Sequence, residues 1–437
     1  MTSPGAPAST AEGRAALDRI VGAYVARRAG WDDTAAAGPA EVRVLDTEVV
    51  RPGRPGLLDV VAEVGPRLVH VALGLRSPGD DQHFFSNGED PVLGVLQDDA
   101  GRLVAFDALR DSQTTALLLE LVTGTPVDPL LVRQVRADES STTMAADDRL
   151  AFTVYDALVR GPRPSTEVLV ALDEVGFNHL AAPLERWRRG DWDLGLVQEH
   201  LAGASTGSAL ALTSVRDLYA SGGPPEVAGG DFGAESHRLG TMTARMHLGL
   251  ERAFGRRPVE PEVWAAAVER AMSAQRGGRG ERPEVVALLD ELRAVGFAGD
   301  AIRTHGDLHL GRVWRTEQGW YVGDFEPGGR PPVISPGLDP PIVVAEDGAV
   351  LRLPLADVAD MMWSFGHVAA SAAAERDPSG REGLQELADA WEQRNRRSFL
   401  AGYLGVPGIS TLVPLGRDAV RVIVSALELE RASRALP

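Results

Sequence analysis

The hydrophobic pattern of this chain changes once along its length, and that change constrains the fold more than any other feature. Up to about residue 200, short apolar or alternating segments are separated by Gly and Pro, which is typical of antiparallel strands. From Phe232 onward, apolar residues recur at i, i+3 and i+4, the spacing of helices that bury one face. The sequence therefore predicts an α+β protein with a β-rich first half and a mainly helical second half.

The expected elements follow this division. Early helices are predicted at Ala11–Ala29, Asp111–Val122 and Thr166–Val175. The predicted strands are Glu41–Val50, Leu57–Val64, Arg67–Leu75, Val92–Leu96, Leu103–Phe106, Leu130–Val135, Leu150–Val154 and Leu194–Glu199. A polar turn, Asp138–Thr143, is expected before the strand at Leu150. The later helices are predicted at Ala234–Phe254, Val263–Ala274, Pro283–Val295, Leu355–Ala373, Glu382–Leu400 and Arg417–Ala435.

Composition excludes several kinds of partner and compartment. The 437 residues contain no apolar run near the ~18 residues needed to cross a bilayer, so no membrane partner is expected. The net charge of −18 is spread along the chain, which argues against a nucleic-acid partner. Met1–Thr10 lacks the basic start and apolar core of a secretory signal, and the chain has no Cys. These features predict a cytoplasmic protein without disulfides, thiolate nucleophiles or Cys-based metal sites. The sequence does not decide between a monomer and a homodimer.

Two acidic segments in the second half carry the candidate chemistry. The run Thr304-His305-Gly306-Asp307-Leu308-His309-Leu310-Gly311-Arg312 is followed, after a strand-like Trp320–Gly323, by Asp324-Phe325-Glu326. Two β-like pieces flanking a polar turn set these carboxylates on adjacent turns. Phosphoryl transfer mainly needs an acceptor for the hydroxyl proton and cations on the phosphate oxygens, so one free and one metal-bound carboxylate suffice. Asp307 suits the first role and Asp324 the second.

These residues resemble the aminoglycoside phosphotransferase group of the protein-kinase-like superfamily. Its catalytic loop reads His-Gly-Asp-x-His and is followed by a metal-binding Asp. Most of the chain is similar to actinobacterial maltokinases, including Val197–Leu201, Thr213–Leu218 and Gly230–Phe232. The resemblance implies ATP and Mg²⁺ as cofactors and a small sugar as substrate. It also implies a bilobal fold with a cap (1–95), a nucleotide-binding N-lobe (96–201) and a helical C-lobe (202–437) that holds the catalytic loop (305–312) and the metal segment (324–326).

The same resemblance assigns the nucleotide-binding residues. Ser140, Ser141, Thr142 and Thr143 would form the phosphate loop, and Gln198, Glu199, His200 and Leu201 the hinge that binds adenine. Thr153 stands where the family places its ATP lysine, and all 44 basic residues of this chain are Arg. Arg133, Arg136 or Arg312 is expected to compensate for the missing lysine. Glu167, the usual partner of that lysine, would lack it.

Position 312 is a second departure from the family. Kinases place an Asn metal ligand five residues after the catalytic Asp, and maltokinases place Gln, whereas this chain has Arg312. A guanidinium only donates hydrogen bonds and cannot bind Mg²⁺. We therefore expect Arg312 to contact phosphate and Glu326 to serve as the second metal ligand beside Asp324.

The end of the chain separates the candidate substrates. Maltokinases continue their last helix through a segment that holds the disaccharide, but here Glu428–Ala435 has lost the Tyr and second Glu of that segment. A monosaccharide is therefore favoured. The chain is similar in this respect to actinobacterial glucosamine kinases, and glucosamine, phosphorylated at its 6-hydroxyl, is the first choice. Substrate contacts are expected from Asp307, His309, Glu326 and, on a late helix, Trp391; the substrate ammonium would pair with Glu326, Asp324 or another C-lobe acid.

Several of these residues also have purely structural interpretations. His305 is expected to brace its loop, and His309 either braces the loop or faces the substrate. His247 is interpreted as a packing histidine, and Asp357 and Asp360 as residues that interact with the terminus of their helix. The alternative functions are a maltokinase, an aminoglycoside phosphotransferase, and a pseudokinase that binds nucleotide without transferring phosphate.

Overall fold

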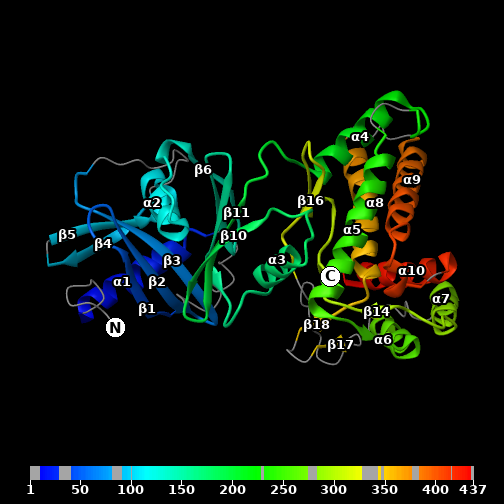
Figure 1. The fold of residues 1–437 in the computed structure, drawn as a ribbon, viewed down its shortest axis with the longest axis horizontal. Coiled ribbons are helices and arrows are strands. Elements are labelled where there is room, and N and C mark those ends of the chain that lie inside the picture. Colours follow the sequence, from blue (N-terminus) through cyan, green and yellow to red (C-terminus); the bar gives the residue numbers. More distant parts are fainter. Residues whose placement is uncertain are drawn as a thin grey trace. The chain divides into compact units, whose positions relative to one another are not determined.

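The structure is a computed structural model that describes ten stretches of the chain: residues 10–28, 41–80, 91–99, 101–227, 231–273, 283–326, 343–345, 349–375, 383–414 and 416–434. Most of the N-terminal decapeptide lies outside the described residues. Two compact units emerge. Unit 1 comprises residues 1–163 and 182–202, and unit 2 comprises residues 164–181 and 203–437. Strands dominate unit 1 and helices dominate unit 2, so the predicted α+β class is confirmed (Figure 1).

The first sheet of unit 1 is built from the earliest predicted strands. Its strand order is β1-β2-β3-β5-β4, and the short β9 also pairs with β3. The bounds are β1 Val42–Arg51, β2 Gly56–Val64, β3 Arg67–Arg76, β4 Val92–Asp98, β5 Gly101–Asp107 and β9 Ala157–Leu158. Residue 95, the expected boundary, lies inside β4, and the sheet continues to Asp107.

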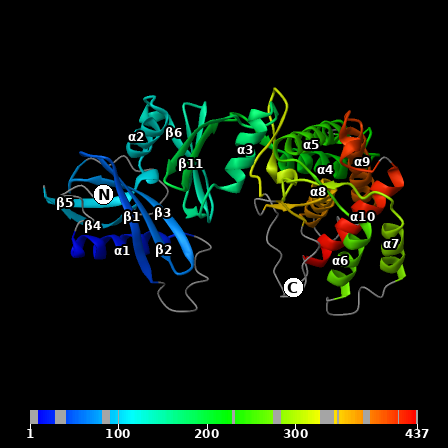
Figure 2. The same ribbon diagram turned by 60° about the horizontal axis from the view of Figure 1, so that its bottom comes forward.

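Strand periodicity explains how this sheet is buried on two faces. Even-numbered residues of β2, from Leu58 to Val64, belong to one core with α1 (Ala11–Val25), which lies against the sheet in Figure 2. Leu57, of opposite parity, belongs to a second core with α2 (Ser112–Thr123). Successive side chains of a strand point to opposite faces, so one strand contributes to both cores.

The second sheet of unit 1 has the order β10-β11-β8-β7-β6. Its bounds are β6 Val132–Ala137, β7 Ser141–Ala146, β8 Leu150–Tyr155, β10 Pro183–Arg189 and β11 Trp192–Glu199, and 3₁₀ turns lie at Ala108–Arg110 and Pro129–Leu131. Strands β7 and β10 were not predicted. The expected polar turn at Asp138–Thr143 is therefore shorter than predicted, because Ser141, Thr142 and Thr143 pair with β8 as part of β7.

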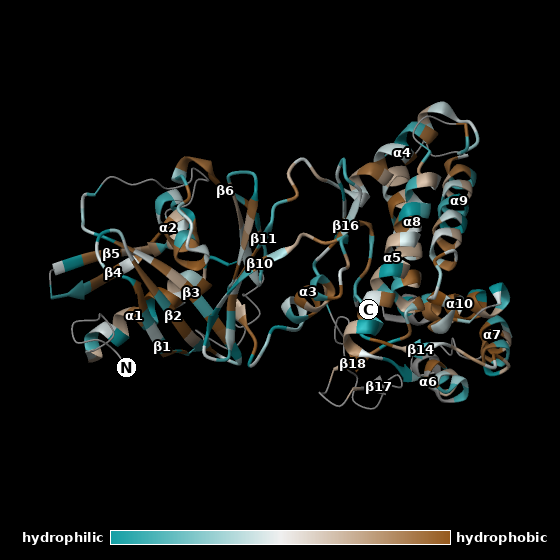
Figure 3. Ribbon diagram, viewed as in Figure 1, coloured by the Kyte–Doolittle hydropathy of each residue, from teal (hydrophilic) through white to brown (hydrophobic). Residues whose placement is uncertain are grey.

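Unit 2 contains the remaining helices and three small sheets. The helices are α3 Pro164–Glu174, α4 Gly207–Ser221, α5 Gly233–Phe254, α6 Pro261–Ser273, α7 Pro283–Arg293, α8 Leu355–Ala374, α9 Leu384–Leu404 and α10 Arg417–Arg434. Both hydrophobic and hydrophilic residues occur along these helices (Figure 3), as expected for helices that bury one face. Among the described helices, none has both the length and the apolarity for crossing a lipid bilayer.

Short strands connect these helices. The sheet β12-β15-β16 comprises Ser205–Thr206, Val313–Arg315 and Trp320–Val322. Two further pairs are β13 (Arg257–Pro258) with β14 (Asp300–Ala301), and β17 (Val343–Val344) with β18 (Val350–Leu351). A 3₁₀ turn at Leu310–Arg312 immediately precedes β15, and another lies at Ile409–Thr411.

Helices α5 and α9 pack with their backbones in close contact. A Cβ added to Gly240 on α5 would overlap the Phe399 carbonyl oxygen of α9, and one added to Gly402 on α9 would overlap the His237 carbonyl oxygen of α5. Backbone atoms cannot move aside as the end of a side chain can. Glycine is therefore required on both sides of this crossing, although it lowers helix propensity.

We predict that Gly240→Ala destabilises unit 2 by at least about 2 kcal/mol, because overpacking against backbone costs more than the gain in helix propensity. Gly249→Ala is the matched control on the same helix. Its Cβ would meet chiefly the flexible end of the Leu172 side chain, at 3.0 Å. Urea denaturation followed by circular dichroism measures both variants, and equal midpoints for the two would contradict the close crossing.

Candidate active site

A β-hairpin brings the two acidic segments together within unit 2. Strand β15 pairs antiparallel with β16, and Val313 lies opposite Val322. The chain before β15 therefore runs beside the chain after β16. Gly323 donates its N–H to the Arg312 carbonyl at 3.3 Å, and Glu326 donates its N–H to the His305 carbonyl at 2.8 Å. The sequence predicted two β-like pieces around a polar turn here, and the structure shows strands β15 and β16 paired as a hairpin.

Arg312 lies at the centre of this cluster and contacts three carboxylates. Its Nη2 is 2.8 Å from Glu326 Oε1 and 3.2 Å from Asp307 Oδ2. Its Nη1 is 3.3 Å from Asp324 Oδ2. The predicted base and both predicted metal ligands thus share one guanidinium. The expected contact of Arg312 with phosphate remains a prediction, whereas its contacts with acids were not anticipated.

Asp307 is surrounded by groups that favour its ionised form. Burial opposes ionisation, but the hydrogen bond from His309 and the positive charge of Arg312 outweigh it and hold the pKa of Asp307 below its usual value. His309 Nδ1 accepts the Gly311 N–H at 3.0 Å, so its Nε2 carries the proton and faces Asp307 Oδ2 at 3.5 Å. Asp307 is therefore a carboxylate at neutral pH, and His309 positions it.

His305 braces the loop from inside. Its Nε2 donates to the Gly323 carbonyl at 2.8 Å, and its Nδ1 accepts the Asp307 N–H at 3.3 Å. This pairing needs the neutral ring, and burial lowers the pKa of His305 accordingly. The bracing role predicted for His305 matches these contacts. Gly306 has a φ of +90°, and Asp324 has a φ of +54°, which is uncommon outside glycine.

The loop is anchored by Asp357, and the sequence analysis did not predict this role. Asp357 lies in the first turn of α8, but its buried carboxylate accepts the backbone N–H groups of His305 at 2.8 Å and Gly306 at 3.0 Å. Its predicted position at the start of its own helix is confirmed, and its contacts with the loop at His305 and Gly306 were not predicted. The sequence neighbours of Asp357 could have indicated this role. They are Leu355, Ala356, Val358 and Ala359, all apolar and buried, and a carboxylate buried among such residues needs hydrogen-bond donors.

His247 completes this network. Its Nε2 contacts Asp357 Oδ2 at 3.0 Å, and its Nδ1 pairs with the Tyr403 hydroxyl at 2.8 Å. Burial opposes ionisation of Asp357, but the hydrogen bond with His247 and the loop N–H groups outweigh it and lower the pKa of Asp357. His247 is a satisfied buried histidine, as predicted, and it also supports the anchor of the loop.

The predicted phosphate loop has a different local structure in unit 1. Asp138 Oδ1 accepts the N–H groups of Ser140 at 2.9 Å and Ser141 at 3.0 Å. Thr142 lies on β7 and accepts a hydrogen bond from Arg28 at 2.7 Å. The turn thus directs these two N–H groups at its own carboxylate, and a phosphate would have to compete with Asp138 for them.

The region of the missing lysine is also paired internally. Thr153 Oγ1 lies 2.9 Å from Thr143 Oγ1 across β7 and β8. Of the arginines expected to compensate, Arg136 contacts Asp138 at 2.9 Å, and Arg133 contacts both Asp148 at 3.1 Å and His200 at 3.2 Å.

Glu167 pairs with an arginine, and not with the lysine that the family resemblance implies. This residue of α3, in unit 2, accepts a hydrogen bond from Arg303 Nη1 at 2.8 Å. The Arg303 guanidinium also stacks over the Phe254 ring, 4.1 Å from its centroid. An arginine of unit 2 therefore neutralises the carboxylate that the family pairs with its ATP lysine.

The predicted hinge lies at the end of β11. Gln198 and Glu199 pair with β8, and His200 donates its N–H to the Arg149 carbonyl at 2.8 Å. Glu199 donates its N–H to the Ala182 carbonyl at 3.0 Å. The binding of adenine at Gln198–Leu201 stays a prediction.

The predicted substrate contact of Trp391 is wrong. Its side chain is buried to 1% exposure, and its Nε1 donates to Ser214 Oγ at 3.0 Å. The ring stacks with Phe232 at 6.2 Å between centroids. Aromatic residues at helical spacing usually pack a core, and this tryptophan does so.

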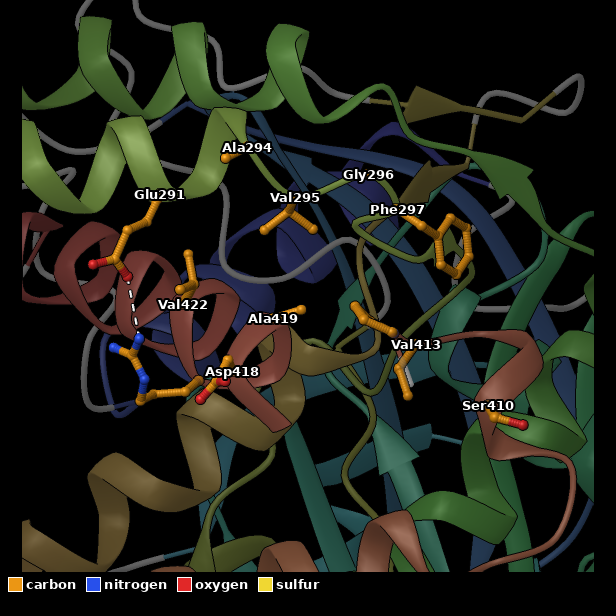
Figure 4. A pocket seen from close by; sticks show the side chains of 12 residues that line it. Glu291, Ala294, Val295, Gly296, Phe297, Ser410, Val413, Asp418, Ala419 and Val422 are labelled. Carbon is orange, nitrogen blue, oxygen red and sulfur yellow. Dashed lines mark hydrogen bonds and ion pairs between the residues drawn. The ribbon is translucent and has the colours of Figure 1, made fainter. Parts of the chain in front are cut away.

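One pocket of the described residues lies apart from the acidic cluster. A hollow of about 610 Å³ in unit 2 lies between the end of α7, the start of α10 and residues near Ile409–Thr411 (Figure 4). Phe297, Val413 and Val422 give it an apolar lining. None of the predicted site residues lines it.

The acidic cluster suits Mg²⁺ only in part. Carboxylate oxygens are the ligands that Mg²⁺ prefers, which fits Asp324 and Glu326. However, the Arg312 guanidinium stands among them, and a divalent ion 4 Å from a guanidinium would be repelled by roughly 8 kcal/mol at an effective dielectric constant of 20. Within the described parts of the chain, no three or more His, Asp or Glu side chains are arranged to hold a metal ion.

Comparison with known proteins identifies the fold. The solved structure of a glucosamine kinase in complex with glucosamine, ADP and inorganic phosphate superposes with a TM-score of 0.57 at 20% identity, covering 91% of this chain and 90% of that one. This chain has a glucosamine kinase fold. Crystal form A of a glucosamine kinase gives the same TM-score at 21% identity, over 91% and 89% of the two chains.

Curated relatives agree with the fold. A glucosamine kinase of Streptacidiphilus jiangxiensis is 28% identical over 415 residues, covering 85% of this chain and 86% of the relative. A glucosamine kinase of Mycolicibacterium smegmatis is 27% identical over 263 residues, which cover 57% of this chain and 64% of the relative. No protein-family model matches the sequence. These similarities support the superfamily predicted from the His-Gly-Asp-Leu-His motif.

We predict that Asp357→Asn lowers the free energy of unfolding by about 2–4 kcal/mol, because an amide offers one acceptor to three donors and turns its own N–H₂ toward one of them. Hydrogen exchange at the amides of His305 and Gly306 should accelerate along with this loss. The control is Asp217→Asn, an exposed acid on α4, which should change stability by less than about 0.5 kcal/mol. Unchanged protection of the two loop amides would refute the anchoring role.

Proposed function

We propose that this chain is a kinase that transfers the γ-phosphate of ATP to a hydroxyl of a small sugar, with glucosamine as the substrate and glucosamine 6-phosphate as the product. The observation that carries the proposal is the ionised Asp307, braced by His305 and His309 beside Asp324, on a fold shared with glucosamine kinases. The similarity to curated glucosamine kinases supports the choice of sugar. The cytoplasm is the proposed location, since ATP is available there and the chain has no Cys.

Asp307 is the proposed base. Its lowered pKa keeps it ionised at neutral pH, so it can accept the proton of the sugar hydroxyl as that oxygen attacks the γ-phosphorus. A weak base suffices, because the hydroxyl proton leaves late in a loose phosphoryl-transfer transition state and positioning supplies most of the rate enhancement. His309 and Arg312 fix the carboxylate from two sides.

The nucleotide contacts are proposed from the family resemblance. Residues Ser140–Thr143, Thr153 and Gln198–Leu201 would contact ATP from unit 1. Asp324 and Glu326 would hold the Mg²⁺ that accompanies ATP, and this ion would neutralise charge on the phosphate oxygens. An arginine is proposed to replace the family lysine, since every cation of this chain other than histidine is Arg.

The charge of the cluster favours a cationic sugar. Three carboxylates face one guanidinium, so the formal charge of the group is −2 with neutral histidines. Glu326, whose side chain is 38% exposed, is the most accessible of the three acids. It is an alternative proposed partner of the substrate ammonium, because a charge-assisted hydrogen bond is about twice as strong as a neutral one. In that case Asp324 alone would hold the Mg²⁺.

We predict ADP release from ATP that depends on Mg²⁺ and on added glucosamine, with far less release on adding maltose. Asp307→Asn should lower kcat by about 10²- to 10⁴-fold while leaving the melting temperature nearly unchanged, since the amide keeps the shape but cannot take the proton. Asp173→Asn, an exposed acid on α3, should retain full kcat. A coupled assay of ADP over a panel of sugars and aminoglycosides measures these effects.

Three results would contradict this proposal in different ways. A larger rate with maltose would overturn the choice of sugar but keep the kinase. A larger rate with an aminoglycoside would indicate an antibiotic-modifying enzyme. Nucleotide-dependent stabilisation without turnover of any acceptor would indicate a nucleotide-binding protein that does not transfer phosphate.

A further inference from the structure

Arg312 is placed where a kinase of this type would be expected to hold a cation. Protein kinases bind two Mg²⁺ ions, one through the Asp that follows the second strand of the hairpin and one through an Asn five residues after the catalytic Asp. Arg312 occupies that Asn position in this chain. Compared with Asn, Arg at this position offers no oxygen to bind a metal ion and carries a permanent positive charge.

The backbone fixes the origin of this side chain. Arg312 ends the 3₁₀ turn Leu310–Arg312, donates its N–H to the His309 carbonyl at 2.8 Å, and accepts the Gly323 N–H at 3.3 Å. The side chain then enters the acidic cluster, where it is 21% exposed. A guanidinium is planar and presents five donors, so it can serve several carboxylates at once.

The two terminal nitrogens of the guanidinium contact all three carboxylates. Nη2 is shared by Asp307 and Glu326, and Nη1 contacts Asp324. These are the oxygens that a metal ion at this position would use. A divalent cation placed among them would meet both a filled space and a like charge.

We propose that the Arg312 guanidinium replaces one of the two metal ions of kinase catalysis, so that this enzyme binds a single divalent ion with its nucleotide. The inference rests on the proposed function, because it concerns the nucleotide-bound site. Arg312 supplies a fixed positive charge beside the catalytic carboxylate at any metal concentration. The remaining ion is the one that Asp324 brings with ATP.

The test counts metal ions directly. Mn²⁺, which replaces Mg²⁺ and is visible by electron paramagnetic resonance, is titrated into protein saturated with a non-hydrolysable ATP analogue, and free Mn²⁺ is measured. The wild type should bind one Mn²⁺ per nucleotide, and Arg312→Gln, which restores an oxygen ligand and removes the charge, should bind two. Arg315→Gln is the matched control on the same hairpin. Arg315 contacts Glu235 at 3.3 Å, so its loss should leave the count at one.

A second measurement needs neither nucleotide nor activity. Without Arg312 the three carboxylates repel one another, so Arg312→Gln should melt several degrees below the wild type in chelator. Millimolar Mg²⁺ should restore most of this loss in the variant and leave the wild type unchanged.

The outcomes separate the two hypotheses. Two Mn²⁺ ions per nucleotide in the wild type, or one in a folded Arg312→Gln protein, would overturn the replacement while the kinase proposal stands. Equal stabilisation of both proteins by Mg²⁺ would also overturn it. Failure of the wild type to bind the ATP analogue would overturn the proposed function, and this inference with it.

Discussion

The buried carboxylate of Asp357 is the interaction on which the described site depends. Two backbone N–H groups of the loop and one imidazole nitrogen converge on it, and it is fully enclosed. A buried charge is tolerated only when such donors compensate for lost hydration, so the loop, α5 and α8 must keep their relative positions for the carboxylate to remain stable. Moving the loop away would leave the Asp357 charge buried without donors, and the free-energy cost of that state keeps the loop in one conformation.

Around Asp357, the side chain that holds the loop in place is different from the charged side chains that could act on a ligand. His305 holds the loop to the hairpin through a neutral ring, whereas Asp307, Asp324 and Glu326 remain partly exposed around Arg312. Partial exposure lets these side chains exchange partners when a charged ligand arrives. A rigid frame with exchangeable charges at its surface is what phosphoryl transfer by positioning and electrostatics requires.

The sequence predicted those features that depend on local pattern. Strand and helix periodicity gave the α+β class and most element bounds, and the polar turn between two β-like pieces predicted the hairpin beside Asp307. Strand β7 was missed, because Ser141, Thr142 and Thr143 resemble a turn in composition and become a strand only through pairing with β8. The role of Trp391 was misjudged, and the loop contacts of Asp357 were missed, for a similar reason: burial is decided by tertiary packing, which a helical repeat alone does not reveal. The contacts of Arg312 depend on three residues distant in sequence, so no local pattern could have shown them.

The glycine crossing of α5 and α9 has a consequence at some distance from itself. Gly240 and His247 are two helical turns apart on α5, and on α9 Gly402 is followed directly by Tyr403, whose hydroxyl meets that imidazole. Main chains in direct contact cannot slide along each other without steric overlap. The crossing therefore also fixes the position of the His247 imidazole along α5 relative to Asp357 and the loop. Two residues without side chains thus act as a spacer that determines the position of His247 and, through its contact with Asp357, that of the loop.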